Sequence, residues 1–171
     1  MKKFFLFMTL CLVSGAMFLS CKDDDGDKDK GEKSYYTYGS DKIEIKNGYC
    51  CLDLMTAWGK ANCFVLTSGT LTGESIFVDW ETNLDEYIEL YVAEMGVELE
   101  PRGGDAQELY LRHSGKTYDE TDLAEGGTVQ VDDNGDGNYT IKLHCEIDGK
   151  KLDCEYTGQF ATKEWNIYTE E

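Results

Sequence analysis

Two stretches near the C-terminus alternate apolar and polar residues with a period of two, and this alternation constrains the fold more than any other feature. The apolar positions of the first stretch are Tyr139, Ile141, Leu143, Cys145 and Ile147. Those of the second are Leu152, Cys154, Tyr156 and Phe160. Successive side chains of a strand point to opposite faces, so each stretch predicts a strand with one dry face and one wet face. Together they predict an antiparallel hairpin over a hydrophobic core.

The expected turn of this hairpin is the two-residue loop Gly149-Lys150, which places Cys145 directly opposite Cys154. Cα atoms of a non-hydrogen-bonded antiparallel pair lie ~4.5 Å apart, near the short end of the range that a disulfide spans. Cysteine also packs well as a small reduced side chain. Two alternatives therefore stand: a Cys145–Cys154 disulfide, or two free thiols in the core.

Shorter patterns of the same kind fill most of the chain between residues 34 and 132. They predict further strands at 35–38, 42–46, 49–58, 63–68, 76–80, 87–92, 109–113 and 128–132. Asn47-Gly48 is a hairpin signal between two of these strands. Residues 116–127 are expected to form a long acidic loop. One core-facing side of strand 49–58 is expected to carry Cys50, Leu52, Leu54 and Trp58.

The segment 83–96 has two interpretations. Its apolar spacing fits one face of a helix, and Asn83 with Glu86 fits a capping box. Residues 87–92 are instead aromatic and β-branched enough for a strand buried on both faces. We prefer the strand because its neighbours are strands. The expected fold is all-β, a single antiparallel β-sandwich domain over residues 34–171, with a lipocalin-like β-barrel as the alternative.

The first 20 residues have the layout of a secretory signal peptide. Lys2 and Lys3 precede an apolar run from Phe4 to Val13, and small residues follow it. The apolar centre is too short for a membrane-spanning helix. The stretch 18–21, Phe-Leu-Ser-Cys, resembles the lipobox of bacterial lipoproteins, in which the cysteine is acylated and becomes the mature N-terminus. The resemblance implies lipidation at Cys21.

The residues after Cys21 carry a second resemblance. Lys22, Asp23, Asp24 and Asp25 resemble the export signal of Bacteroidota surface lipoproteins. This resemblance implies a protein anchored to the outer membrane by its lipid and exposed at the cell surface. Residues 21–33 then form the lipidated cysteine and an acidic tether, which contains no apolar residue after Cys21.

The charge of the chain narrows the classes of partner. It contains 16 Lys and Arg against 34 Asp and Glu, a formal net charge of −18 at pH 7. Such a surface repels nucleic-acid phosphates and anionic lipid headgroups, so we expect no nucleic-acid partner. It suits cations, cationic partners or neutral sugars.

Cysteine and histidine usage argues against the common zinc sites. Five cysteines remain besides Cys11 and Cys21, so at least one thiol is expected to be free; the five are Cys50, Cys51, Cys63, Cys145 and Cys154. The chain has no Cys-x-x-Cys pair and only two histidines. We expect His144 on a solvated strand face and His113 at a loop edge, and the sequence assigns no catalytic residue.

One loop resembles half of a calcium site. Residues 132–137 place oxygen-bearing side chains at Asp132, Asn134 and Asp136 and a glycine at the sixth position. Leu143 stands where the bidentate glutamate of such a loop belongs. Asp, Asn and Gly are also ordinary turn residues, so the turn is favoured and calcium remains a weak alternative.

The C-terminal third resembles small Bacteroidota lipoproteins with a C-terminal β-hairpin. The resemblance is carried by the stretches Gly127–Val131, Asp136–Ile141, Asp148–Leu152 and Tyr156–Gly158. These are turn and strand motifs, so they imply a β fold and no catalytic residue. The sequence departs from the pattern around residues 100–105, where Pro-Arg-Gly-Gly replaces the expected Pro-Gly-Thr-Tyr turn.

Aromatic residues are the remaining candidates for ligand contact. Trp58, Trp80 and Tyr118 are candidates to stack on a sugar or anchor a partner. A core or sheet-edge role is favoured for Trp58 and Trp80, so Tyr118, in the acidic loop, is the better candidate for an exposed contact. The leading hypothesis is a non-enzymatic surface lipoprotein that binds a glycan, a peptide or an outer-membrane protein. The alternatives are a small glycan hydrolase that uses carboxylates and an acidic inhibitor or immunity-type protein.

Overall fold

The computed structural model describes residues 34–57, 59–76, 84–101 and 108–165. The chain divides into two compact units, 1–31 and 32–171, and the described residues belong to the second. The predicted signal peptide, the lipidation site Cys21, the export signal 22–25 and the tether lie outside the described residues. So do Trp58, Trp80 and all but the first residue of the predicted strand 76–80.

The described part of the chain is all-β and contains no helix, as predicted. Eleven strands form one sheet: β1 (Ser34–Tyr38), β2 (Asp41–Ile45), β3 (Asn47–Thr56), β4 (Gly59–Thr67), β5 (Tyr87–Val92), β6 (Glu98–Leu99), β7 (Glu108–His113), β8 (Lys116–Tyr118), β9 (Thr128–Gly135), β10 (Asn138–Ile147) and β11 (Lys150–Thr162). The order is β6-β9-β10-β11-β3-β4-β5-β7-β8, with β1 paired to β11 and β2 to β1. The sheet does not close on itself, so it is a β-sandwich and not the alternative barrel.

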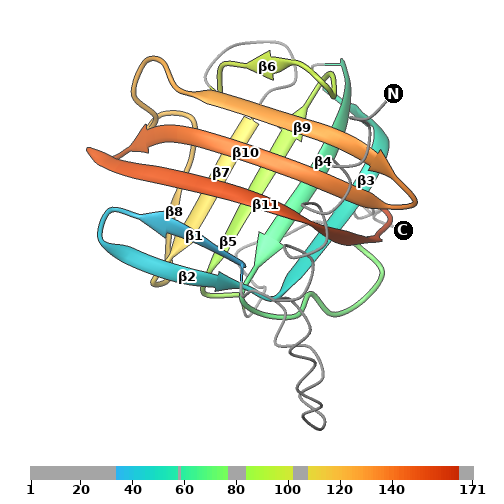
Figure 1. The fold of residues 1–171 in the computed structure, drawn as a ribbon, viewed down its shortest axis with the longest axis horizontal. Helices are drawn as coiled ribbons and strands as arrows, with labels where there is room; N and C mark the ends of the chain where they lie inside the picture. The colour runs from blue at the N-terminus through green and yellow to red at the C-terminus, as the bar shows by residue number, and fades with distance from the viewer. Residues whose placement is uncertain (1–33, 58, 77–83, 102–107, 166–171) are drawn as a thin grey trace, which may run out of the picture. The chain divides into compact units, whose positions relative to one another are not determined.

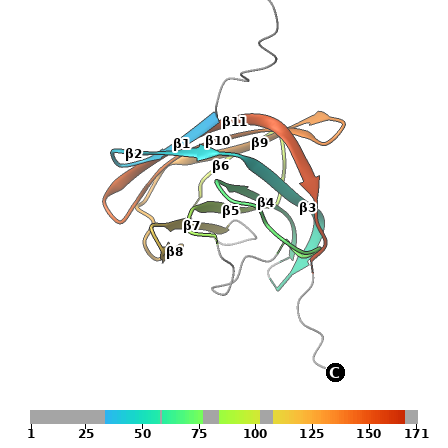
Figure 2. The same ribbon diagram turned by 90° about the horizontal axis from the view of Figure 1, so that it is seen from below.

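The sheet folds into two packed layers. One layer contains β9, β10 and β11 with the β1–β2 hairpin, and its strands cross those of the other layer, β3, β4, β5, β7 and β8 (Figure 1). Figure 2 shows the two layers facing each other. The main core lies between them and includes Leu143 and Leu152 from the first layer and Phe64, Leu66 and Leu90 from the second. Each such side chain contributes roughly 1.5–3 kcal/mol through burial.

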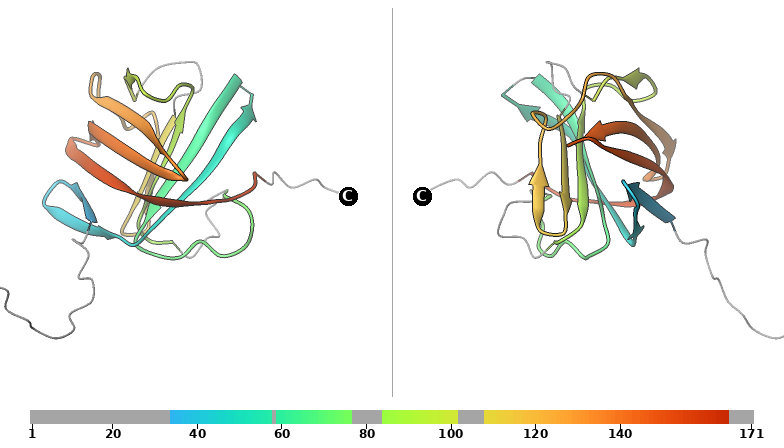
Figure 3. Two further views of the ribbon diagram at one scale, coloured as in Figure 1. Left: turned by 45° about the vertical axis from the view of Figure 1, so that its right-hand side comes forward. Right: turned by 90° about the vertical axis from the view of Figure 1, so that its left-hand side faces the viewer.

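Strand β11 joins the two layers. Its first part pairs with β10 and β1, and its last residues pair in parallel with β3 (Figure 3). In that contact Phe160 lies beside Gly48, and a Cβ atom at Gly48 would come within 2.9 Å of the Phe160 ring. The predicted turn at Asn47-Gly48 is therefore wrong. The glycine lies inside a strand, where it allows a close approach.

The hairpin of β10 and β11 confirms the alternation but corrects the turn. The two central turn residues are Asp148 and Gly149, both with positive φ (49° and 73°), and Ile147 pairs with Lys150. A two-residue hairpin turn with two positive φ angles favours Asp-Gly, whereas Lys at the second position would be strained. The shift places Cys145 opposite Leu152 and Cys154 opposite Leu143.

The two cysteines of this hairpin are consequently not a disulfide. They are diagonal neighbours on one face, a relation that puts Cα atoms ~7–8 Å apart, beyond what a disulfide spans. Both are free and buried. The alternative of two reduced core thiols is the one that the structure contains.

A bulge in β3 changes the predicted face of that strand. The register with β4 shifts between Cys51 and Leu54, and Asp53 adopts a positive φ of 58°. Cys50 faces the core between the layers, as predicted, and Cys51 faces the outer side. Leu54 lies beyond the bulge and therefore also faces the outer side, not the predicted core side. Leu52, predicted in the core, is 38% exposed. The bulge removes the strict period of two on which the prediction rested.

The outer face of β3, β4 and β5 carries a second apolar cluster. Leu71, Ile76 and Leu84, which follow β4 and precede β5, belong to it. This cover explains why all six residues of β5 are buried. The preference for a strand over a helix at 87–92 is confirmed, and its physical basis is burial on both faces.

Candidate functional site

Tyr118, the candidate for an exposed aromatic contact, is buried and only 6% exposed. It belongs to β8, which forms a hairpin with β7, so the predicted acidic loop begins only after residue 118. The Tyr118 ring packs against the Tyr38 ring at 5.5 Å between centroids, and Lys116 Nζ lies 4.1 Å from its centre. Tyr118 is therefore a core residue, and the prediction of an exposed aromatic side chain there is wrong.

The half calcium motif has ordinary hairpin geometry. Strand β9 runs through Gly135, and the turn to β10 is Asp136-Gly137, again with positive φ at both residues. Asn134 Nδ2 donates to Thr140 Oγ1 at 2.9 Å, and Asp132 Oδ1 accepts a hydrogen bond from Gln130 Nε2 at 2.8 Å. Among the described residues no group of three or more His, Cys, Asp or Glu side chains is arranged to hold a metal ion.

A square of two glutamates and two tyrosines lies on the outer face of β5 and β7. Glu89 is directly opposite Tyr110, and Tyr91 is directly opposite Glu108. Along each strand the tyrosine hydroxyl donates to the glutamate two residues before it. Tyr91 donates to Glu89 Oε1 at 2.7 Å, and Tyr110 donates to Glu108 Oε2 at 3.0 Å. We call these four residues the Glu–Tyr square.

The local sequence explains the square. The tripeptide Glu-Leu-Tyr occurs twice, at 89–91 and at 108–110. Alternation sends both leucines into the main core and the Glu and Tyr side chains to the outer face. Antiparallel pairing of two identical tripeptides then sets each glutamate opposite a tyrosine. This repeat was visible in the sequence, but which strands pair was not, and we did not predict the site.

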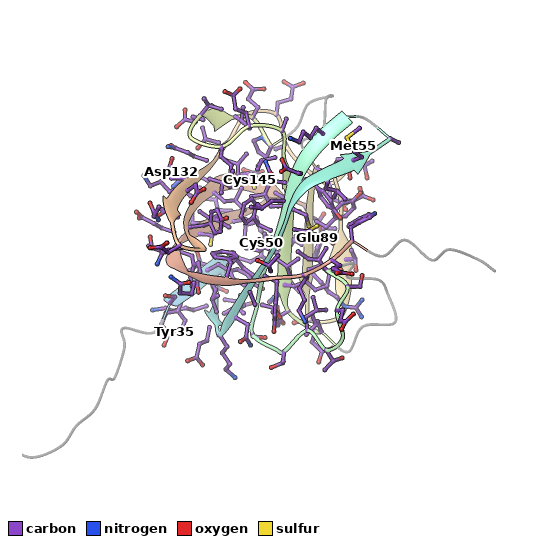
Figure 4. All side chains as sticks on the ribbon, turned by 90° about the vertical axis from the view of Figure 1, so that its right-hand side faces the viewer. Tyr35, Cys50, Met55, Glu89, Asp132 and Cys145 are labelled. Atoms are coloured by element: carbon purple, nitrogen blue, oxygen red, sulfur yellow. The ribbon has the colours of Figure 1, made fainter. Side chains whose placement is uncertain are left out.

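Glu89 is the most unusual residue of the square. It is 4% exposed, one of only two buried polar or charged residues in the described part of the chain. Burial raises its pKa to about 7, the hydrogen bond from Tyr91 opposes the rise, and the nearby Glu108 carboxylate adds to it. The Glu89 carboxyl group therefore changes between its protonated and ionised forms near neutral pH. Figure 4 shows it near the middle of the sheet, away from Asp132 on β9.

The aromatic rings of the square continue into the C-terminal segment. The Tyr91 ring meets the Tyr110 ring at 6.3 Å and the Trp165 ring at 6.0 Å, both nearly edge to face. Tyr110, Glu108 and Trp165 are partly exposed, whereas Tyr91 is buried. The arrangement presents accessible rings and a carboxylate above a buried acid. Rings stack on apolar ligand faces and carboxylates accept hydrogen bonds from hydroxyl groups.

A second polar cluster surrounds His113, which we expected at a loop edge. Its Nδ1 lies 2.9 Å from Glu86 Oε2, and its Nε2 lies 3.1 Å from Asp41 Oδ2. Glu86 also accepts hydrogen bonds from the Ser114 backbone N–H and the Tyr36 hydroxyl. The side chain of His113 is only 13% exposed. The cluster ties β2 to the ends of β5 and β7, and its partners saturate the imidazole, so we assign it a structural role. His144 lies on the exposed face of β10, as expected.

Two large apolar side chains are exposed at the β3–β4 hairpin. Met55 is 72% exposed and Leu52 is 38% exposed. Figure 4 shows Met55 near the end of this hairpin. The described residues offer no charge pattern or cover that would identify a partner for it.

The comparisons with protein-family models, with curated proteins and with solved structures produce no match. Within the described ranges no helix has the length and apolar character needed to span a membrane. The function must therefore be argued from the site and from the sequence.

Proposed function

We propose that this protein is a surface-exposed outer-membrane lipoprotein that binds a neutral glycan at the Glu–Tyr square without cleaving it. The observation that carries the proposal is the pair of partly exposed rings, Tyr110 and Trp165, that flank Tyr91 beside the Glu108 carboxylate. Sugar rings present apolar C–H faces to aromatic side chains and hydroxyl groups to carboxylates. The net charge of −18 favours a neutral or cationic ligand over an anionic one.

Affinity electrophoresis in gels that contain neutral polysaccharides tests the binding proposal. The native protein should migrate more slowly in a gel that contains its ligand than in a plain gel. Tyr110→Ala should weaken this retardation about tenfold, because one buried aromatic contact contributes roughly 1–2 kcal/mol. Tyr35→Ala is the matched control, since Tyr35 lies on β1 and contacts Lys42. Equal retardation of native protein and Tyr110→Ala would refute the site.

Glycan hydrolysis is the second candidate, and one observation favours it. A carboxyl group with a pKa of about 7 beside a second carboxylate is the pairing that glycosidases use as general acid and nucleophile or base. The burial of Glu89 argues against it, because a catalytic acid must reach the glycosidic oxygen. Release of reducing ends by the native protein, lost in Glu89→Gln with polysaccharide retardation retained, would replace the binding proposal by this one.

The anchoring proposal rests on the lipobox resemblance at Cys21 and the acidic residues after it. A cysteine with multiple acyl chains binds a membrane almost irreversibly, since each buried methylene contributes ~0.8 kcal/mol. Mass spectrometry of the membrane-purified protein should find acyl chains on Cys21. Cys21→Ser should leave the membrane fraction, and replacement of residues 22–25 by alanine should protect the protein from protease added to whole cells. An unmodified Cys21 thiol would contradict the proposal.

A further inference from the structure

Cys51 and Cys63 face each other directly across β3 and β4. The register of the two antiparallel strands pairs them, and both side chains belong to the apolar cluster on the outer face. Side chains in this relation have Cβ atoms ~4.5–5.5 Å apart, close to the ~3.5–4.5 Å that a disulfide requires. Both thiols are free in the structure, so bond formation requires the two sulfurs to move together.

The remaining cysteines of the described chain have no such relation. Cys50 lies opposite Phe64 and faces the core between the layers, on the other side of the sheet from Cys51. Cys145 and Cys154 lie opposite leucines, as described above. The register therefore singles out one pairing among the five thiols, and it is not the pairing that the sequence suggested.

We propose that Cys51 and Cys63 form a disulfide when the protein folds in the presence of a disulfide oxidant. The inference goes beyond the proposed function, because it depends neither on the glycan site nor on the lipid at Cys21. The disulfide would cross-link the two strands of the β3–β4 hairpin next to the bulge at Asp53.

The chemistry is thiol–disulfide exchange in two steps. The thiolate of Cys51 attacks one sulfur of the oxidant, forms a mixed disulfide and releases the other sulfur as a thiolate that takes up a proton. The thiolate of Cys63 then attacks the Cys51 sulfur and releases the second thiol. Two protein thiols are oxidised, one disulfide of the oxidant is reduced to two thiols, and the two protons pass from the protein to the products.

The structure indicates when this exchange takes place. Cys63 is fully buried and Cys51 is 8% exposed. Burial is the main cause that raises the pKa of both thiols, so little thiolate exists in the folded protein. Oxidation should therefore occur while the hairpin forms and before Leu71, Ile76 and Leu84 pack on the cluster, and the folded reduced protein should oxidise slowly.

Refolding of the full chain with glutathione disulfide tests the inference. The reduced chain is unfolded, refolded with the oxidant, alkylated in denaturant and digested with trypsin. Cleavage at Lys46, Lys60 and Arg102 yields one fragment with Cys50 and Cys51 and a second with Cys63. We expect these two fragments to be linked, with a mass about 2 Da below the sum of the two reduced fragments plus one alkyl group on Cys50. The same treatment of folded reduced protein should give the linkage at least about tenfold more slowly.

Substitutions identify the bond. Cys50→Ser should keep the linked fragments, whereas Cys51→Ser and Cys63→Ser should each lose them. Absence of the linkage in the refolded native chain would overturn the inference, and so would a linkage that survives Cys51→Ser. If a variant does not fold, the position of the alkyl group in the linked native fragments identifies the bond: an alkylated Cys50 supports the inference and an alkylated Cys51 overturns it. Polysaccharide retardation of the reduced protein, measured in parallel, keeps the outcome separate from that of the proposed function.

Discussion

A carboxyl group that is buried in a sheet face makes stability depend on pH, and Glu89 is such a residue. Its folded-state pKa is raised, to about 7, mainly by burial. Between the ordinary value of 4.5 and about 7 the folded protein binds more protons than the unfolded chain. The free energy of unfolding should therefore fall as pH rises through this window, by up to about 3 kcal/mol, and should depend little on Glu89 above it.

Glu89→Gln tests whether the free energy of unfolding falls as pH rises. The amide keeps the shape and still accepts the hydrogen bond from Tyr91 at its oxygen, but it has no charge to bury. We expect the variant to gain stability over the native protein at about pH 8 and to lose that advantage at about pH 5. Urea unfolding at both pH values measures the difference. Parallel pH profiles for the two proteins would contradict the prediction.

Glu108→Gln is the matched control on the neighbouring strand. Glu108 is partly exposed, and its negative charge helps to raise the pKa of Glu89. Removing that charge should lower the pKa of Glu89. The pH range over which the free energy of unfolding depends on Glu89 should then become narrower but should not disappear. If Glu108→Gln and Glu89→Gln gave the same pH profile of the free energy of unfolding, the pH dependence would come from the negative charge of the whole sheet face and not from Glu89.

At the scale of elements, the β1–β2 hairpin is attached to the second layer through His113. His113→Ala removes contacts to Glu86, next to β5, and to Asp41 on β2, so the cluster joins three different parts of the chain. The loss leaves a partly buried carboxylate with fewer partners and should cost about 1–3 kcal/mol of unfolding free energy. His144→Ala should change stability by less than about 0.5 kcal/mol, because its contact with Asp153 is solvent-exposed. Chemical denaturation of both variants measures the two costs, and equal costs would refute the attachment.

At the scale of elements, local sequence patterns predicted some strands correctly but did not predict how the strands pair. Local periodicity was sufficient for the strands of the β10–β11 hairpin and for β5, because alternation and β-branched content report burial directly. The turn at Asp148-Gly149 was missed by one residue, and that shift moved Cys145 away from Cys154. Cys51 and Cys63, and the two Glu-Leu-Tyr tripeptides, meet through pairings that no local pattern specifies. The bulge that moves Leu54 to the outer face is likewise invisible to a strict period of two.

At the scale of the whole sandwich, the two layers are joined by the end of β11. Beyond the three paired residues, the Lys163 backbone N–H donates to the Cys50 carbonyl at 2.8 Å, and Lys163 Nζ reaches the Gly73 carbonyl. One main core spans both layers, so they should unfold together. The backbone contacts between the end of β11 and β3 should therefore stabilise the whole domain and not one layer alone.

Lys163→Pro separates the backbone contribution from that of the side chain. Both Lys163→Ala and Lys163→Pro lose the contacts of Nζ, but only proline also removes the N–H donor and leaves the Cys50 carbonyl unpaired. We expect Lys163→Pro to be less stable than Lys163→Ala by about 1–3 kcal/mol. Because the main core holds both layers, the urea midpoint should fall while the slope of the transition stays unchanged. A smaller slope or a second transition in Lys163→Pro would mean that the layers separate when the joint is broken, which contradicts a single cooperative sandwich.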